Sequence, residues 1–378
     1  MLQNVRLLNY RGLKDTTIPL APITLLTGSN GIGKTSVLEG LFFLLSSQYP
    51  DAAVFPRYPL IINLAQNRFS SKQIPVIQGY DYLSFWEECP TDGANNCQAE
   101  ANSEYLKLSW EMRISEFAEL DPEFKSKAAT YGLQNSIGAQ YVFWEWRCMG
   151  KRKDDNSSYG FTDVNDRIKA VMQLSLQQHF AQNIIMQTNS SICRYVDMSS
   201  VRYCPNKLSL QSERFLTEAL QIINPEVTGV RCDGNPGRLR VIINDESEYS
   251  LGTLGVGAET WASMLLMLTE LVSTDEKHLP IKMFLSDEIG AGIHYSKLEE
   301  MWDFLFKFSL KHPQIQMVMT THSQDCISAF CKTFQNEKTG MAHIVRLHKF
   351  DENEGVQTTV YPQKAFDTIL SDKWEVRG

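Results

Sequence analysis

The sequence predicts an α/β fold with a mixed, mainly parallel sheet, an N-terminal antiparallel β subdomain and a mixed α/β insertion. Three apolar runs, at residues 22–28, 281–288 and 314–322, each have the length of one buried strand. Each run leads into a helical pattern further along the chain. Strands that alternate with helices in this way favour a parallel sheet that is covered on both faces.

The chain divides into three stretches that differ in composition. Residues 1–48 contain two short strand patterns, "NVRLLNY" and "TTIPL", before the first buried strand and its helix. Residues 49–199 are rich in aromatics and polar loops, and we expect an inserted lid or partner-binding subdomain there. Residues 200–378 return to alternating strands and helices, after a hairpin with its turn at Asp245–Ser247. We expect 1–48 and 200–378 to form one discontinuous domain.

Two helices are predicted in the C-terminal stretch, from "AETWASMLLMLTELV" and "SKLEEMWDFLFKFSLKH". Ser296 and Glu299 have the spacing of a capping box at the start of the second helix. Its apolar stripe consists of Leu298, Met301, Trp302 and Leu305. Both helices are therefore expected to cover the parallel sheet.

Composition excludes several classes of protein. No apolar run reaches the roughly 18 residues of a membrane span, and the N-terminus does not have the pattern of a secretory signal. Eight cysteines without a C-x-x-C pair fit a reducing, cytoplasmic location. A net charge of −8 disfavours direct binding to nucleic acid by this chain alone.

The segment "GSNGIGKT" at residues 28–35 fits the phosphate-binding pattern G-x-x-x-x-G-K-[ST]. It follows an apolar strand and opens a helix, whose N-terminus favours anions. The glycines allow the backbone to form a concave nest with its amides facing phosphate. We expect ATP to be bound by Asn30, Gly31, Gly33, Lys34, Thr35 and Ser36. Lys34 would reach the β- and γ-phosphates, and the Thr35 hydroxyl would ligate Mg²⁺.

Two further strands end in residues suited to phosphate chemistry. "MFLSDE" delivers Asp287 and Glu288, and "MVMTTH" delivers His322. Ligands of parallel α/β sheets lie beyond the carboxyl ends of the strands. We expect Asp287 to hold Mg²⁺ and Glu288 to polarise the attacking water. His322, on a neighbouring strand, would reach the γ-phosphate or that water.

These motifs, in this order, resemble the ABC-type ATPases, in the branch that contains SMC, RecF and overcoming-lysogenization-defect (OLD) proteins. The likeness covers residues 1–48 and 200–378, and includes "LLNYRGLKDTTIPL", "DEIGAGIHYSKLEEMWDFL" and "TTHSQDCISAF". It implies an ABC-type P-loop ATPase head. It also implies that Arg11, in the element formed with Asn9 and Gly12, lies near the nucleotide.

In this family two protomers sandwich two nucleotides, so the resemblance implies a homodimer or higher homo-oligomer. The loop "LGVGAET" stands where the family's signature loop caps the partner's γ-phosphate. Gly257 matches the glycine whose amide faces phosphate, while Gly255 replaces a serine. The alternative is a plain glycine-rich start of a core helix.

Two other family elements are incomplete. "GAGIH" at 290–294 takes the place of the D-loop but does not contain its aspartate. A glutamine for the Q-loop is not assigned, and Gln66, Gln73 and Gln78 are the candidates. The missing aspartate predicts that the protomers do not communicate through this residue, and the missing serine of the signature loop predicts slow hydrolysis.

The functional hypothesis is an ATPase that acts as sensor or scaffold of an anti-phage defence complex. No nuclease motif is visible in the sequence, so a separate nuclease effector, of the TOPRIM type, is expected to act in trans. The ATPase of the PARIS-type anti-phage pair has this architecture. One alternative is a RecF-like repair or recombination ATPase that binds DNA directly, and another is a nucleotide-dependent scaffold that does not hydrolyse ATP.

Overall fold

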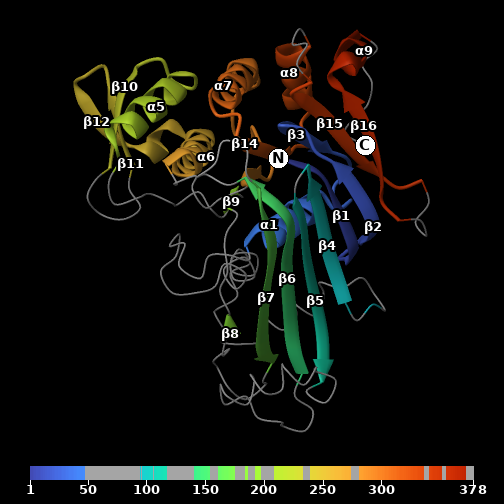
Figure 1. Cartoon of the computed structure of the whole chain (residues 1–378). Coiled ribbons are helices and arrows are strands. Elements are labelled where there is room, and N and C mark those ends of the chain that lie inside the picture. Colours follow the sequence, from blue (N-terminus) through green and yellow to red (C-terminus); the bar gives the residue numbers. More distant parts are fainter. Residues whose placement is uncertain are drawn as a thin grey trace.

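The computed structural model describes most of the chain as three β-sheets with helices around them (Figure 1). The described residues are 1–46, 94, 96–104, 106–116, 140–153, 161–174, 184–185, 192–196, 208–232, 239–273, 281–335, 340–350 and 355–371. The predicted α/β class with a mixed sheet is confirmed.

The central sheet has six strands in the order β16-β15-β3-β14-β13-β9. Its strands are β3 (Ile23–Thr27), β9 (Ile192–Val196), β13 (Lys282–Ser286), β14 (Ile315–Thr320), β15 (Ala342–His348) and β16 (Gln357–Pro362). Every pairing is parallel except that of β15 with β16. The three predicted buried strands are therefore neighbours, with β14 between β3 and β13.

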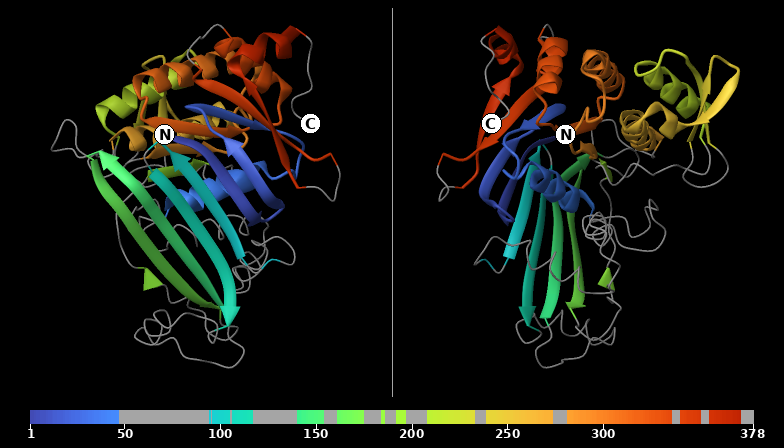
Figure 2. Two further views of the ribbon diagram at one scale, coloured as in Figure 1. Left: turned by 45° about the vertical axis from the view of Figure 1, so that its right-hand side comes forward. Right: turned by 180° about the vertical axis from the view of Figure 1, so that it is seen from behind.

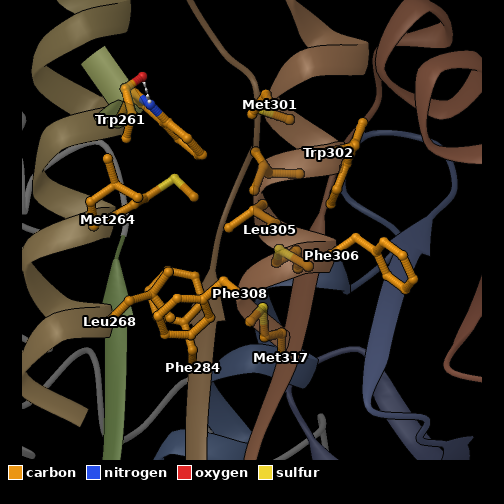
Figure 3. Close-up of a cluster of buried hydrophobic side chains, with 14 of the residues drawn as sticks. Trp261, Met264, Leu268, Phe284, Met301, Trp302, Leu305, Phe306, Phe308 and Met317 are labelled. Carbon is orange, nitrogen blue, oxygen red and sulfur yellow. Dashed lines mark hydrogen bonds between the residues drawn. The ribbon is translucent and has the colours of Figure 1, made fainter. Parts of the chain in front are cut away.

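Helices cover one face of this sheet. They are α6 (Val256–Ser273), α7 (Leu298–Lys311), α8 (Gln324–Phe334) and α9 (Phe366–Ser371), while α5 (Leu210–Gln221) packs on α6. Alternation along the strands explains this core, because Phe284 and Met317 point to the helices while Leu285 and Val318 point to the opposite face. Figure 3 shows Trp261 and Met264 of α6 facing Leu305 and Phe308 of α7.

Helix α1 (Lys34–Ser46) covers the other face and lies between two sheets (Figure 2). The second sheet is antiparallel, with seven strands in the order β2-β1-β4-β5-β6-β7-β8. These are β1 (Leu2–Tyr10), β2 (Leu13–Pro19), β4 (Asn96–Ser103), β5 (Leu106–Glu116), β6 (Gln140–Lys153), β7 (Phe161–Leu174) and β8 (Ile184–Ile185). Buried on both sides, α1 is apolar around most of its circumference.

Side-chain hydrogen bonds tie the antiparallel sheet to the central one. Buried Gln316 of β14 accepts from the Leu2 amide at 3.0 Å and donates to the Leu2 carbonyl at 2.9 Å. The Thr16 hydroxyl donates to the Val356 carbonyl at 3.0 Å, next to β16. The first and second strands of the chain are thus anchored to strands near its other end.

The division into a discontinuous domain (1–48 and 200–378) and an insertion (49–199) stays a prediction. Strands from the two parts pair with each other at two places. β1 pairs with β4, so the N-terminal strands and part of the 49–199 stretch form one continuous sheet. β9, from the same stretch, pairs with β13 in the central sheet. In the described residues of 49–199 the elements are strands.

A small antiparallel sheet, β10 (Val227–Cys232), β11 (Leu239–Ile243) and β12 (Ser247–Ser250), packs with α5 at the side of the molecule (Figure 1). The β11–β12 hairpin was predicted, and its turn begins one residue earlier than expected. Asn244 and Asp245 have φ of +52° and +59°, a left-handed conformation that Asn and Asp tolerate, and the Glu246 amide donates to the Ile243 carbonyl at 3.1 Å.

The predicted capping box of the second long helix is wrong, although its apolar stripe is buried as expected. A 3₁₀ turn, Tyr295–Lys297, precedes α7, and the N-cap residue of α7 is Lys297, which makes no side-chain cap. Ser296 is engaged elsewhere, because its hydroxyl lies 2.9 Å from Nδ1 of His294. Among the described helices, none has the length and hydropathy needed to cross a membrane.

Candidate functional site

The phosphate-binding loop lies between β3 and α1, and its glycines are required for different reasons. Gly28, Gly31 and Gly33 have φ of +137°, +78° and +110°, which side chains strongly disfavour. A Cβ on Gly28 would lie 2.4 Å from the Leu347 carbonyl oxygen, and one on Gly33 would lie 2.9 Å from the Leu13 side chain. A Cβ on Gly31 would meet nothing within 4 Å, so the loop is open at that point.

Lys34 is held over the loop in which it lies. Its Nζ donates to the carbonyl oxygens of Gly28 at 2.9 Å and of Ser29 at 3.1 Å. Burial lowers the pKa of Lys34, while the charges of Glu288 and Asp287 raise it. The ammonium group is therefore placed at the loop and faces the acidic pair from the neighbouring part of the sheet.

Asp287 connects the loop to the strand ends. One carboxylate oxygen, Oδ2, accepts from the Thr35 hydroxyl at 2.9 Å, and the other, Oδ1, accepts from the Thr320 hydroxyl at 2.6 Å. These residues come from the start of α1, the end of β13 and the end of β14. The parallel register explains the meeting, because these strand ends lie at one edge of the sheet.

Glu288 and His322 form a second pair at the same edge. Nδ1 of His322 lies 2.6 Å from Oε2 of Glu288, and the two side chains are 60% and 30% exposed. Glu288 has φ of +54°, a left-handed conformation that turns its side chain away from the course of β13. Beneath the pair lies Cys326, where burial raises the pKa of the thiol to about 12, so it adds no charge to the site.

Arg11 lies in the turn between β1 and β2, beside the phosphate-binding loop. Its Nε lies 3.4 Å from Oε2 of Glu39 on α1, and the Tyr10 hydroxyl donates to the same oxygen at 3.2 Å. The Glu39 side chain is 1% exposed, so this is a buried charge with polar neighbours. Leu13, at the end of the turn, is the side chain that packs on Gly33.

The other residues predicted to bind ATP lie in the same loop and in the first turn of α1. Asn30 is exposed at the tip of the loop, and Ser36 is buried in the first turn of α1. The Q-loop candidates Gln66, Gln73 and Gln78 lie outside the described residues. The structure therefore brings together Lys34, Thr35, Asp287, Glu288 and His322, with Arg11 at the side of the loop.

Gly257 lies against a different loop. It is buried in the first turn of α6, and a Cβ there would be 2.1 Å from the carbonyl oxygen of Gly292. Gly292, in turn, has φ of +78°, and its Cβ would be 3.0 Å from the Cα of Gly257. The predicted signature loop and the "GAGIH" loop are thus in backbone-to-backbone contact.

The structure gives a physical reason for the missing serine. Gly255 has φ of 91° and ψ of 167°, a region that is essentially restricted to glycine. A Cβ at this position would meet nothing within 4 Å, so the restriction comes from the backbone and not from crowding. The exposed Val256 and Tyr295 border this pair of loops.

Thr320 and Glu39 were not among the predicted site residues. Thr320 stands in an apolar strand pattern, and Glu39 in the middle of an apolar helix, so local sequence gives little signal for either. The one signal was that each is a polar residue within a buried element, and a buried polar side chain requires a hydrogen-bond partner.

The arrangement fits a nucleoside triphosphate with Mg²⁺. The open position at Gly31, the loop backbone and the Lys34 ammonium suit phosphate oxygens. The Thr35 hydroxyl and the Asp287 carboxylate are hard oxygen ligands, which Mg²⁺ prefers.

Comparisons with known proteins give matches of different extent. Residues 1–76 match the AAA ATPase domain family. The OLD nuclease of Thermus scotoductus is 36% identical over 55 residues, which are 15% of this chain and 10% of that protein. The chain thus spans about a tenth of that relative's length. An ATP/GTP phosphatase of Helicobacter pylori is 21% identical over 381 residues, covering 96% of each chain.

Among solved structures, the recombination mediator protein RecF with ATPrS, of the RecFOR pathway, is 10% identical with a TM-score of 0.38. The match covers 92% of this chain and 96% of that one.

Proposed function

We propose that this chain, whose N-terminal residues match the AAA ATPase domain family, is an ABC-type ATPase that binds ATP with Mg²⁺ and hydrolyses it slowly in an anti-phage defence complex. It would be the sensor or scaffold, and a separate nuclease would be the effector. The observation that carries the ATPase proposal is the meeting of Thr35 with Asp287 and of Glu288 with His322 at one sheet edge.

The binding half of the proposed site is the loop and its helix. Backbone amides from Asn30 to Gly33 and the N-terminus of α1, where Ser36 lies in the first turn, bind the phosphates. Lys34 leaves the Gly28 and Ser29 carbonyls and binds the β- and γ-phosphates. Mg²⁺ would be held by Thr35 and Asp287, and it would neutralise charge on the phosphates.

The hydrolytic half is Glu288 with His322. The Glu288 carboxylate orients a water for attack on the γ-phosphorus and accepts its proton as the bond to the β,γ-bridging oxygen breaks. His322 holds that carboxylate through Nδ1, which leaves Nε2 on the far side of the ring for the γ-phosphate. Arg11 adds positive charge at the side of the loop.

The second half of each site would come from another copy of the chain. In the proposed homodimer, or higher homo-oligomer, the amide of Gly257 and the N-terminus of α6 face the partner's γ-phosphate. Gly255 supplies no hydroxyl, and a lost hydrogen bond to a charged group is worth about 1.5–3 kcal/mol. This supports slow turnover.

Support for hydrolysis and support for the defence role have different sources. The relative named as an ATP/GTP phosphatase is aligned with nearly the whole chain, which supports phosphate-bond hydrolysis. The relative named as an OLD nuclease is aligned with only 55 residues, or 15% of this chain. The defence role and the separate nuclease therefore depend on that kinship and on the sequence motifs.

Three measurements test the proposal. Phosphate release from ATP should require Mg²⁺, and calorimetry should detect ATP binding by the purified full chain. Purification of the tagged chain from its native host should yield a nuclease-like partner protein. Absence of ATP binding would refute the ATPase proposal, and the lack of any partner would contradict the defence role alone.

The alternative is a RecF-like repair or recombination ATPase that binds DNA directly. It predicts duplex binding that weakens steeply with salt, and hydrolysis that DNA stimulates. The net charge of −8 disfavours it as a property of this chain alone. A salt titration of duplex binding, with and without ATP, distinguishes the two functions.

A further inference from the structure

Thr320 forms hydrogen bonds with the three consecutive residues that follow β13. It is fully buried as the last residue of β14, between β3 and β13. Its hydroxyl donates to Oδ1 of Asp287 at 2.6 Å and accepts from the Glu288 amide at 2.8 Å. Its backbone carbonyl accepts from the Ile289 amide at 2.8 Å.

The two side-chain bonds set the direction of the hydroxyl. A threonine has one O–H donor, and here the carboxylate of Asp287 takes it. The lone pairs then face the Glu288 amide, so each bond favours the geometry of the other. Asp287 is thereby held with its other oxygen, Oδ2, toward Thr35.

The same bonds support an unfavourable backbone conformation. Glu288 has φ of +54°, which an L-residue adopts rarely and which persists when surrounding contacts hold it. The amides on both sides of its Cα, those of Glu288 and Ile289, are both bound by Thr320. This turn directs the Glu288 side chain to His322.

We propose that Thr320 is a positioning residue for the ATPase reaction, which sets the metal ligand Asp287 and the base Glu288 through one hydroxyl. The inference depends on the ATPase function proposed above. It makes one side chain responsible for both metal binding and the direction of the base, whereas the sequence motifs assign these tasks to separate residues.

Threonine-to-valine exchange tests the hydroxyl, because valine has nearly the same shape. In Thr320→Val the activation by Mg²⁺ should shift to about 10- to 100-fold higher concentration, the range found when groups behind metal ligands are removed. The turnover number should fall by a similar factor, while ATP binding without Mg²⁺ should change by less than about threefold, since Lys34 and the loop are intact.

Two further variants separate positioning from stability. Thr320→Ser keeps the hydroxyl and should restore Mg²⁺ activation to within about threefold of the wild type, as for a retained hydrogen bond. Thr24→Val is the matched control. Thr24 is also fully buried, on β3, and its hydroxyl accepts from the Ala21 amide at 2.9 Å, away from the strand ends that carry the site. Thr24→Val should lose stability but keep Mg²⁺ activation.

The outcomes are distinct. If Thr320→Val matches Thr24→Val in Mg²⁺ activation and turnover, the inference is overturned. If the wild type does not hydrolyse ATP, the proposed function fails, and amide hydrogen exchange still tests Thr320. Thr320→Val should then expose the Glu288 amide to faster exchange, while the Ile289 amide, bound by the retained Thr320 backbone carbonyl, serves as the internal reference. Unchanged protection of the Glu288 amide would overturn the inference by itself.

Discussion

Two parts of the molecule carry the motifs of the ATPase, and they are built differently. The cis half, formed by the loop at 28–35 with Asp287, Glu288 and His322, is joined by side-chain hydrogen bonds between separate strands and a helix. The glycine face, residues 255–257 with 290–294, is joined by backbone contact between Gly257 and Gly292.

The difference indicates what each part is able to do alone. The cis half draws its ammonium, hydroxyl, carboxylates and imidazole from one copy of the chain, so one copy should bind nucleotide. The glycine face offers amides and a helix N-terminus but few functional side chains. Glycine is required at 257 by the lack of space for a Cβ and at 255 by the backbone conformation. In the proposed homodimer, this face would act on the nucleotide of a second copy.

Removing the Lys34 ammonium should have the largest effect, because the cis half is expected to bind ATP without help. Lys34→Ala should weaken ATP binding by at least about 100-fold, since each hydrogen bond to a charged group contributes about 1.5–3 kcal/mol. Calorimetry with ATP and Mg²⁺ measures the affinity. Lys307→Ala is the control, because Lys307 forms an exposed pair with Asp303 on α7. Wild-type ATP affinity in Lys34→Ala would contradict the assignment of this loop to the ATP site.

Neutralising Glu288 should affect turnover and leave binding intact. Glu288→Gln should lower the turnover number by about 100- to 10,000-fold, as expected for loss of a general base. ATP affinity should stay near the wild-type value, because the loop and Lys34 are unchanged. Single-turnover phosphate release measures the first effect, and Glu299→Gln, an exposed carboxylate paired with Lys332, is the control. Full cellular function without hydrolysis would favour the non-hydrolysing scaffold.

The sequence was sufficient to predict most of the cis half, because its residues follow buried strands whose length and order can be seen in the pattern. Asp287 and His322 could be placed together once β13 and β14 were expected to be parallel neighbours. Thr320 could not be assigned a role, since its importance comes from a register that brings its hydroxyl to Asp287 across two strands.

Errors and gaps arose where a competing local contact or the pairing of distant strands overrides the simple sequence pattern. Ser296 has the spacing of a helix cap, yet its hydroxyl lies beside His294, and a 3₁₀ turn takes the place of the cap. β4 continues the N-terminal sheet, which no feature of residues 96–103 reveals in isolation. Pairing between distant strands leaves no local mark in composition.

Enlarging Gly257 should test whether the glycine face is one unit. Gly257→Ala places a Cβ against the Gly292 carbonyl, so stability should fall by about 1–3 kcal/mol, as for other overpacked positions. ATP binding by the monomer should stay intact, while ATP-dependent dimerisation weakens because both loops shift together. Denaturant unfolding and sedimentation measure these effects. Gly31→Ala, where the Cβ has space, separates crowding from backbone strain. Unchanged stability in Gly257→Ala would contradict the close contact.

The smallest effect is expected from restoring the family's serine, and this prediction is the sharpest test of how the two halves differ. If the missing hydroxyl alone slowed hydrolysis, Gly255→Ser would accelerate it. The backbone at Gly255 argues otherwise, because φ of 91° with ψ of 167° costs a non-glycine residue about 1–3 kcal/mol. We therefore expect a modest loss of stability and no gain in turnover. Gly255→Ala should behave the same, since it shares the strain without the hydroxyl. Faster hydrolysis in the serine variant but not in the alanine variant would show that the loop adapts, and that side-chain chemistry can be added to the glycine face.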